Sequence, residues 1–76
     1  MEELIRSIAL SLVDNPDEVV VSSSIKEGET VVELKVAASD MGKVIGKQGR
    51  IAKAIRVVAK AAAAKENKAV SVEIVQ

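Results

Sequence analysis

Hydrophobic residues in this chain repeat with two different periods, and the order of the two periods constrains the fold. Residues 2–13 carry apolar side chains at helical spacing, and Pro16 ends that stretch because proline cannot continue a helix. Residues 18–25 and 30–36 alternate with the period of two that is typical of strands, and Gly28 lies in the turn between them. The first half of the chain therefore predicts a helix followed by a β-hairpin.

The second half returns to helical spacing and then to alternation. Residues 39–45 predict a short helix with Ser39 or Asp40 at its N-cap, and residues 50–65, rich in Ala and Lys, predict a long one. Residues 69–75 alternate again and predict the last strand. One face of the long helix is expected to enter the core, namely the face formed by Ile51, Ile55, Val58 and Ala62.

The resulting order, α-β-β-α-α-β, predicts an α+β fold in one domain of residues 1–76. Each predicted strand has one apolar and one largely polar face, so all three helices should cover the same face of the sheet. The helical passage before the last strand is long enough for a right-handed crossover, which predicts a three-stranded mixed sheet. The strand residues expected on the helix side include Val19, Val21, Ser23, Ile25, Val32, Leu34 and Val36.

Composition excludes several classes of function. The chain has no Cys and no His, so it lacks thiolate metal sites, the usual general base and the commonest metal ligand. It has no aromatic residue on which a base could stack. No apolar run approaches the roughly 20 residues of a membrane span, and the acidic N-terminus is unlike a signal peptide. We therefore expect a cytoplasmic protein that is not an enzyme, binds no metal or cofactor and does not insert into membranes.

Charge is divided along the chain although its sum is zero. Residues 1–36 carry eight acidic and three basic side chains, whereas residues 37–76 carry eight basic and three acidic ones. Six positive residues and no negative one lie between Lys43 and Lys60. Such asymmetry indicates a side of the molecule that faces a polyanion.

Two glycines, Gly46 and Gly49, separate the two predicted helices and admit two interpretations. In the structural interpretation Gly46 takes the left-handed conformation at a helix end, and Gly49 lets the next helix begin closely packed. In the functional interpretation the missing side chains let a ligand approach the backbone, and the N–H groups at the start of the long helix favour a phosphate. The cations around the glycines, Lys43, Lys47, Arg50 and Lys53, favour the second interpretation. A nucleotide-binding P-loop is excluded because three residues, not four, separate Gly42 from Gly46.

The run "VIGKQG" followed by a basic helix resembles the core of a KH domain, in which an aliphatic pair precedes Gly-x-x-Gly and an amphipathic helix. The predicted element order is similar to the bacterial, type II arrangement of that domain, so the resemblance covers essentially the whole chain. The length and the run "GKVIGKQGRIAKAIR" resemble the single-domain bacterial KH proteins of the KhpA family.

The resemblance implies that the loop clamps about four nucleotides of single-stranded RNA. The clamp would consist of Gly46, Lys47, Gln48, Gly49 and Arg50. Flanking cations and an aliphatic groove would complete the site, formed by Lys43, Lys53, Val44, Ile45, Val36 and Ile55. Many KH sequences have two isoleucines three residues apart in the helix after the loop, and here the first of these positions is Ala52. Arg56 and Lys60, further along the helix, are interpreted as a solvated face.

The family further implies an RNA chaperone or post-transcriptional regulator that forms a homodimer or pairs with a second KH protein of the Jag type. Two other functions remain open at this point. One is a helix-turn-helix DNA reader with residues 50–65 as recognition helix, although the exposed face of that helix offers no Asn, Gln or Ser for base edges. The other is a protein–protein adaptor that uses a KH-like fold without binding RNA.

Overall fold

The structure, a computed structural model, describes residues 1–76 and has its secondary structure in the predicted order. The helices are α1 (Glu2–Leu10), α2 (Met41–Ile45) and α3 (Arg50–Ala64), and the strands are β1 (Val20–Lys26), β2 (Glu29–Lys35) and β3 (Val70–Val75). Three short 3-10 turns connect them, at Pro16–Glu18, Ala38–Asp40 and Lys47–Gly49. No helix combines the length and the hydrophobicity that crossing a bilayer requires.

The sheet is mixed, as predicted, with β2 in the middle. β1 pairs with β2 antiparallel, and β3 pairs with β2 parallel. A two-residue turn closes the hairpin between the paired residues Lys26 and Glu29. Both turn residues, Glu27 and Gly28, have positive φ, which is the turn geometry that matches the twist of a hairpin.

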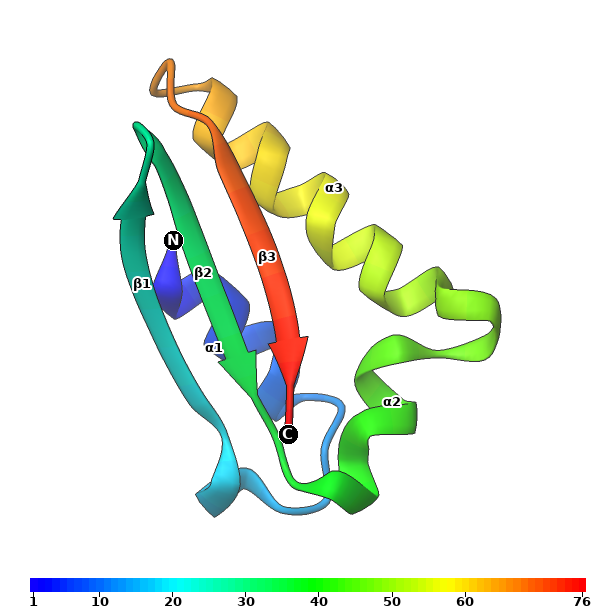
Figure 1. Ribbon diagram of the computed structural model, residues 1–76. Coiled ribbons are helices and arrows are strands. Elements are labelled where there is room, and N and C mark those ends of the chain that lie inside the picture. Colours follow the sequence, from blue (N-terminus) through cyan, green and yellow to red (C-terminus); the bar gives the residue numbers. More distant parts are fainter.

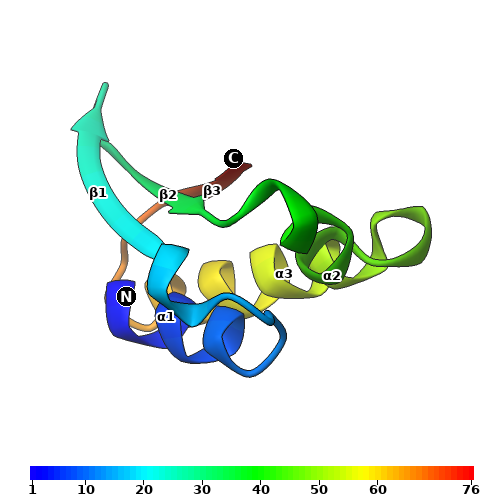
Figure 2. The ribbon, with the colours of Figure 1, turned by 90° about the horizontal axis from the view of Figure 1, so that it is seen from below.

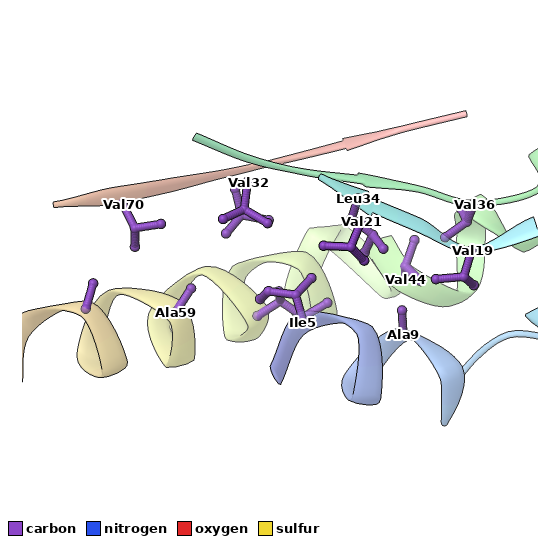
Figure 3. Packing of buried hydrophobic residues seen from close by; sticks show 13 residues of the cluster. Ile5, Ala9, Val19, Val21, Val32, Leu34, Val36, Val44, Ala59 and Val70 are labelled. Carbon is purple, nitrogen blue, oxygen red and sulfur yellow. The ribbon is translucent and has the colours of Figure 1, made fainter. Parts of the chain in front are cut away.

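All three helices lie against one face of this sheet (Figure 2). The core between the two layers is aliphatic, with the side chains of the sheet pointing toward those of the helices (Figure 3). Val32, Leu34 and Val36 face the helices as predicted and are at most 2% exposed. Ile5 and Ala9 of α1 meet them from the helix layer.

Two expectations, one about the core and one about the end of a helix, were wrong. The side chain of Ile25 is 78% exposed, although it was expected on the buried face of the first strand. Ser23, two residues earlier, already contacts Glu2 in the first turn of α1, so Ile25 lies beyond the start of the helix that covers β1. α1 ends at Leu10 rather than at residue 13. The chain continues there with hydrogen bonds of the 3-10 type, such as the one from the Leu12 N–H to the Ala9 carbonyl.

The face of α3 that enters the core also differs from the prediction. The buried residues are Ala52, Ile55, Ala59 and Ala63, while Val58 is 42% exposed. Alanines bring the helix axis close to the sheet, which a face built of larger side chains would prevent. The periodicity could not reveal this choice, because both candidate faces of α3 consist of apolar residues.

Candidate nucleic-acid interface

The loop between α2 and α3 has an unusual backbone. Gly46 has φ 76° and ψ 176°, Gln48 has φ 58° and ψ 25°, and Gly49 has φ 74° and ψ 14°. Three positive φ angles within four residues turn the chain sharply out of α2 and into α3. The loop protrudes from the body of the molecule beside the β3 edge of the sheet (Figure 1).

The two glycines have different roles, and these are the reverse of the structural interpretation made from the sequence. Gly49, not Gly46, takes the left-handed helical conformation, and the space where its Cβ would lie is open. Gly46 is the closely packed one, because a Cβ there would lie 2.6 Å from Cγ1 of Ile51. Its combination of positive φ with extended ψ is also accessible essentially to glycine alone.

Backbone N–H groups remain free at the tip of the loop. The Gly46 N–H donates to the Gly42 carbonyl at 2.9 Å, and the Gly49 N–H donates to the Gly46 carbonyl at 3.1 Å. Neither Lys47 nor Gln48 donates its N–H to another backbone group. These two amides, next to the positive end of the α3 dipole, are suited to bind an anion.

The side chains that were predicted to form a clamp, Lys47, Gln48 and Arg50, are exposed. Nη2 of Arg50 donates to Oε1 of Gln48 at 3.2 Å, which holds the guanidinium beside the loop. Neither Lys47 nor Arg50 forms an ion pair with a carboxylate, and the same is true of Lys53 one turn further on. The structure therefore brings three of the predicted cations to one end of α3 with their charges uncompensated.

Lys43 is different from these cations because carboxylates already surround it. Its Nζ lies 3.1 Å from a carboxylate oxygen of Asp14 and 3.8 Å from one of Asp40. The hydrogen bond and charge of Asp14 are the main reason that the pKa of Lys43 lies above its ordinary value. A phosphate would have to compete with both carboxylates for this ammonium group.

Asp40 is one of the two residues predicted as the N-cap of the short helix, but its side chain makes other contacts. The residue stands at the N-cap position of α2 but makes no side-chain capping bond there. Its buried carboxylate instead accepts the backbone N–H groups of Asp14 at 3.1 Å and Asn15 at 3.0 Å, and the side-chain amide of Asn15 at 3.1 Å. The bond from the Asp14 N–H contributes most to holding the pKa of Asp40 below its ordinary value. Asp40 thus ties the α2 end of the site to the chain that follows α1.

Most of the aliphatic residues assigned to a groove lie in the core instead. Val36, Val44 and Ile55 are 2%, 0% and 2% exposed, so their side chains hold the loop in position from below and present almost no surface. Ile45 is half-buried and keeps some surface. No pattern in the sequence indicated that Ile51 would lie against Gly46.

Arg56 was interpreted as part of a solvated face, but it has a specific contact. Its Nε donates to the backbone carbonyl of Val72 in β3 at 3.2 Å. Lys60, one turn further along α3, makes no hydrogen bond or ion pair with another side chain.

A shallow apolar groove of about 300 Å³ lies on the helical side, between α1 and α3. It is lined by Ile8, Leu12, Arg50, Ile51, Ala54, Ile55 and Val58. Val58 has 42% of its surface exposed there, and the neighbouring Val57, which does not line the groove, has 60% exposed. The groove is adjacent to the loop, since two of its lining residues are Arg50, which follows the loop directly, and Ile51, which is the nearest neighbour of Gly46.

Comparison with known proteins covers nearly the whole chain. The family model for the "KhpA/KhpB, KH domain" matches residues 2–74. A relative from Clostridium acetobutylicum, named RNA-binding protein KhpA, is 67% identical over 75 residues, which are 99% of this chain and 100% of the relative. Proteins of the same name from Caldanaerobacter subterraneus and Listeria monocytogenes are 60% identical over 75 residues and 47% identical over 76 residues, and each match covers the whole relative and at least 99% of this chain.

Proposed function

This chain belongs to the KhpA/KhpB family of KH domains, and we propose that it binds single-stranded RNA as a non-enzymatic post-transcriptional regulator or RNA chaperone. The clamp in this proposal is the loop Gly46–Gly49 together with Arg50. The relatives named above are RNA-binding proteins by name, and their similarity extends across the loop.

One observation carries the proposal: the loop offers two unpaired backbone N–H groups, of Lys47 and Gln48, beside cations that have no carboxylate partner. A purely structural turn could leave such amides to water, but it would not require Lys47, Arg50 and Lys53 around them. A sugar–phosphate backbone supplies the acceptors that these donors lack. Because neither glycine has a side chain, the strand can come into contact with the backbone itself.

The clamp is small, so one domain should bind weakly. A KH loop holds about four nucleotides, and this chain has no aromatic side chain to add stacking energy. Two linked copies would raise the affinity through effective concentration. We therefore also propose self-association through the apolar groove between α1 and α3, where water would otherwise cover exposed aliphatic surface. Pairing with a second KH protein of the Jag type stays a prediction. The same groove would be the surface for that contact.

An NMR titration with a short single-stranded oligoribonucleotide tests the clamp. We expect the largest amide shifts at Gly46–Arg50, and we expect the affinity to fall steeply with added salt because bound phosphates release counterions. An excess of duplex DNA should not displace the RNA, whereas a helix-turn-helix reader would prefer the duplex. Unmoved loop amides, with RNA bound elsewhere or not at all, would favour the adaptor function instead.

A charge placed in the apolar groove should prevent self-association. We expect Val58→Glu to raise the dimer dissociation constant at least about tenfold, since the carboxylate would be buried without a partner. Val57→Glu is the matched control, because it places the same charge one residue away, outside the groove. Sedimentation equilibrium across a concentration series measures the dimer dissociation constants of the wild type and of both variants. A wild-type chain that stays monomeric throughout, or two variants that behave alike, would remove the groove from the proposal.

A further inference from the structure

The outer edge of β3 carries backbone groups that no strand satisfies. The carbonyls of Ala69 and Val75 accept N–H groups of β2 and its flanking residue, from Thr30 and Val36, both at 3.1 Å. Backbone groups of a paired strand point alternately to its two sides, so the carbonyl of Val72 points away from β2. β3 is the last strand of the sheet, and this outer side lies next to α3 (Figure 1).

Arg56 of α3 occupies part of this edge. Its Nε donates to the Val72 carbonyl at 3.2 Å, and this contact fixes the plane of the guanidinium against the strand. Arginine carries five N–H donors, and the four on the two Nη atoms have no hydrogen-bond or ion-pair partner in the structure. A guanidinium oriented by one nitrogen, with its other donors free, is arranged to receive a pair of acceptors.

The position of Arg56 relates it to the clamp. It follows Arg50 by six residues, or about 9 Å along the helix axis. A strand whose phosphates lie on the loop would extend past this point within the roughly four nucleotides that a KH loop holds. The half-buried Ile45 and Ile74 lie on the two elements that flank this region, α2 and β3.

We propose that Arg56 reads a base of the bound strand and selects guanine over adenine at one position. This inference rests on the proposed RNA binding and adds a specificity-determining residue to it. Guanine presents two adjacent acceptors, O6 and N7, which match two Nη donors along one edge of the planar guanidinium. Adenine presents N7 beside an amino group. Because that amino group is itself a donor, one of the two Nη donors of the guanidinium would have no acceptor opposite it. The bases of a single strand are unpaired, so these edges are accessible.

The probes are RNA hexamers of uridine in which one position at a time carries guanosine or adenosine instead. The wild-type chain should prefer guanine at one position by roughly 5- to 30-fold, in line with a single bidentate contact. Arg56→Gln should reduce this ratio to about one or invert it, because glutamine pairs with N6 and N7 of adenine. Arg56→Lys keeps the charge but not the planar pair of donors, so it should also lose the preference. Lys60→Gln, which removes a charge from the same helix, should keep the wild-type ratio.

Each alternative gives a different result. If Arg56 contacts a phosphate, Arg56→Gln lowers the affinity for both purines equally and reduces the salt dependence, and the inference is overturned. If Arg56 merely joins α3 to β3, its variants lower the melting temperature and leave the guanine-to-adenine ratio unchanged, which also overturns it. A wild-type chain that binds RNA without preferring guanine at any position has the same consequence. Absence of binding to every hexamer would instead refute the proposed function itself.

Discussion

Replacing Lys47 and Gln48 together by aspartate should weaken the binding of single-stranded RNA at least about thirtyfold, or roughly 2 kcal/mol. The change removes a cation and a neutral donor from the tip of the loop and places two carboxylates where the phosphates would lie. Attraction becomes repulsion at the point of closest approach, and the backbone N–H groups of both residues are then shielded by anions. Fluorescence anisotropy with a labelled oligoribonucleotide measures the effect, repeated at several salt concentrations.

The fold should survive this double substitution. Both side chains are exposed, and neither contributes to the core. Gln48 has φ 58°, a conformation that aspartate adopts more readily than most residues. We therefore expect the free energy of unfolding to change by about 0.5 kcal/mol or less.

A control separates local contact from total charge. Lys60→Glu with Ala61→Glu changes the net charge by the same amount, at two adjacent exposed positions more than two turns away from the loop. Glutamate is used there because it suits a helix interior. This control should weaken RNA binding far less than the loop variant does. Equal losses in the two variants would show that the chain attracts RNA by its overall field, and the clamp would have to be abandoned.

Hydrophobic periodicity was sufficient to predict the element order, and the long helical passage before the last strand was sufficient to predict the mixed sheet. It failed where two faces of one element are both apolar, as in α3, whose alanines rather than Val58 enter the core. It also failed at Ile25, because the pattern of a strand does not say where the covering helix ends.

The geometry of the candidate site was predictable from the sequence in the loop and not in the residues around it. Glycines and cations at Gly46–Arg50 form a local pattern, so the sequence alone could locate them. The partners of Asp40 come from residues 14 and 15, and the partner of Arg56 is a backbone carbonyl sixteen residues away. Because every residue type has a backbone carbonyl, the identity of a residue does not indicate that its carbonyl is contacted. Such contacts can be identified only in the structure.

Gly46→Ala should be the most destabilising of the alanine substitutions at the loop glycines, by about 2 to 6 kcal/mol. Its backbone conformation costs a residue with a Cβ about 1 to 3 kcal/mol, and the added methyl would lie 2.6 Å from Cγ1 of Ile51, which adds an overpacking term of about 1 to 3 kcal/mol. Gly49→Ala should cost about 1 to 2 kcal/mol, because its left-handed conformation is unfavourable but the space around it is open. Denaturant unfolding of each variant gives these free energies. In an Ile51→Ala background Gly46→Ala should cost less than in the wild type, because the contact with Cγ1 at 2.6 Å is removed, although the contact with the Cβ of residue 51 at 2.9 Å stays. If Gly46→Ala proved no less stable than Gly49→Ala, the close contact between Gly46 and the start of α3 would be refuted, and with it the backbone geometry on which the clamp depends.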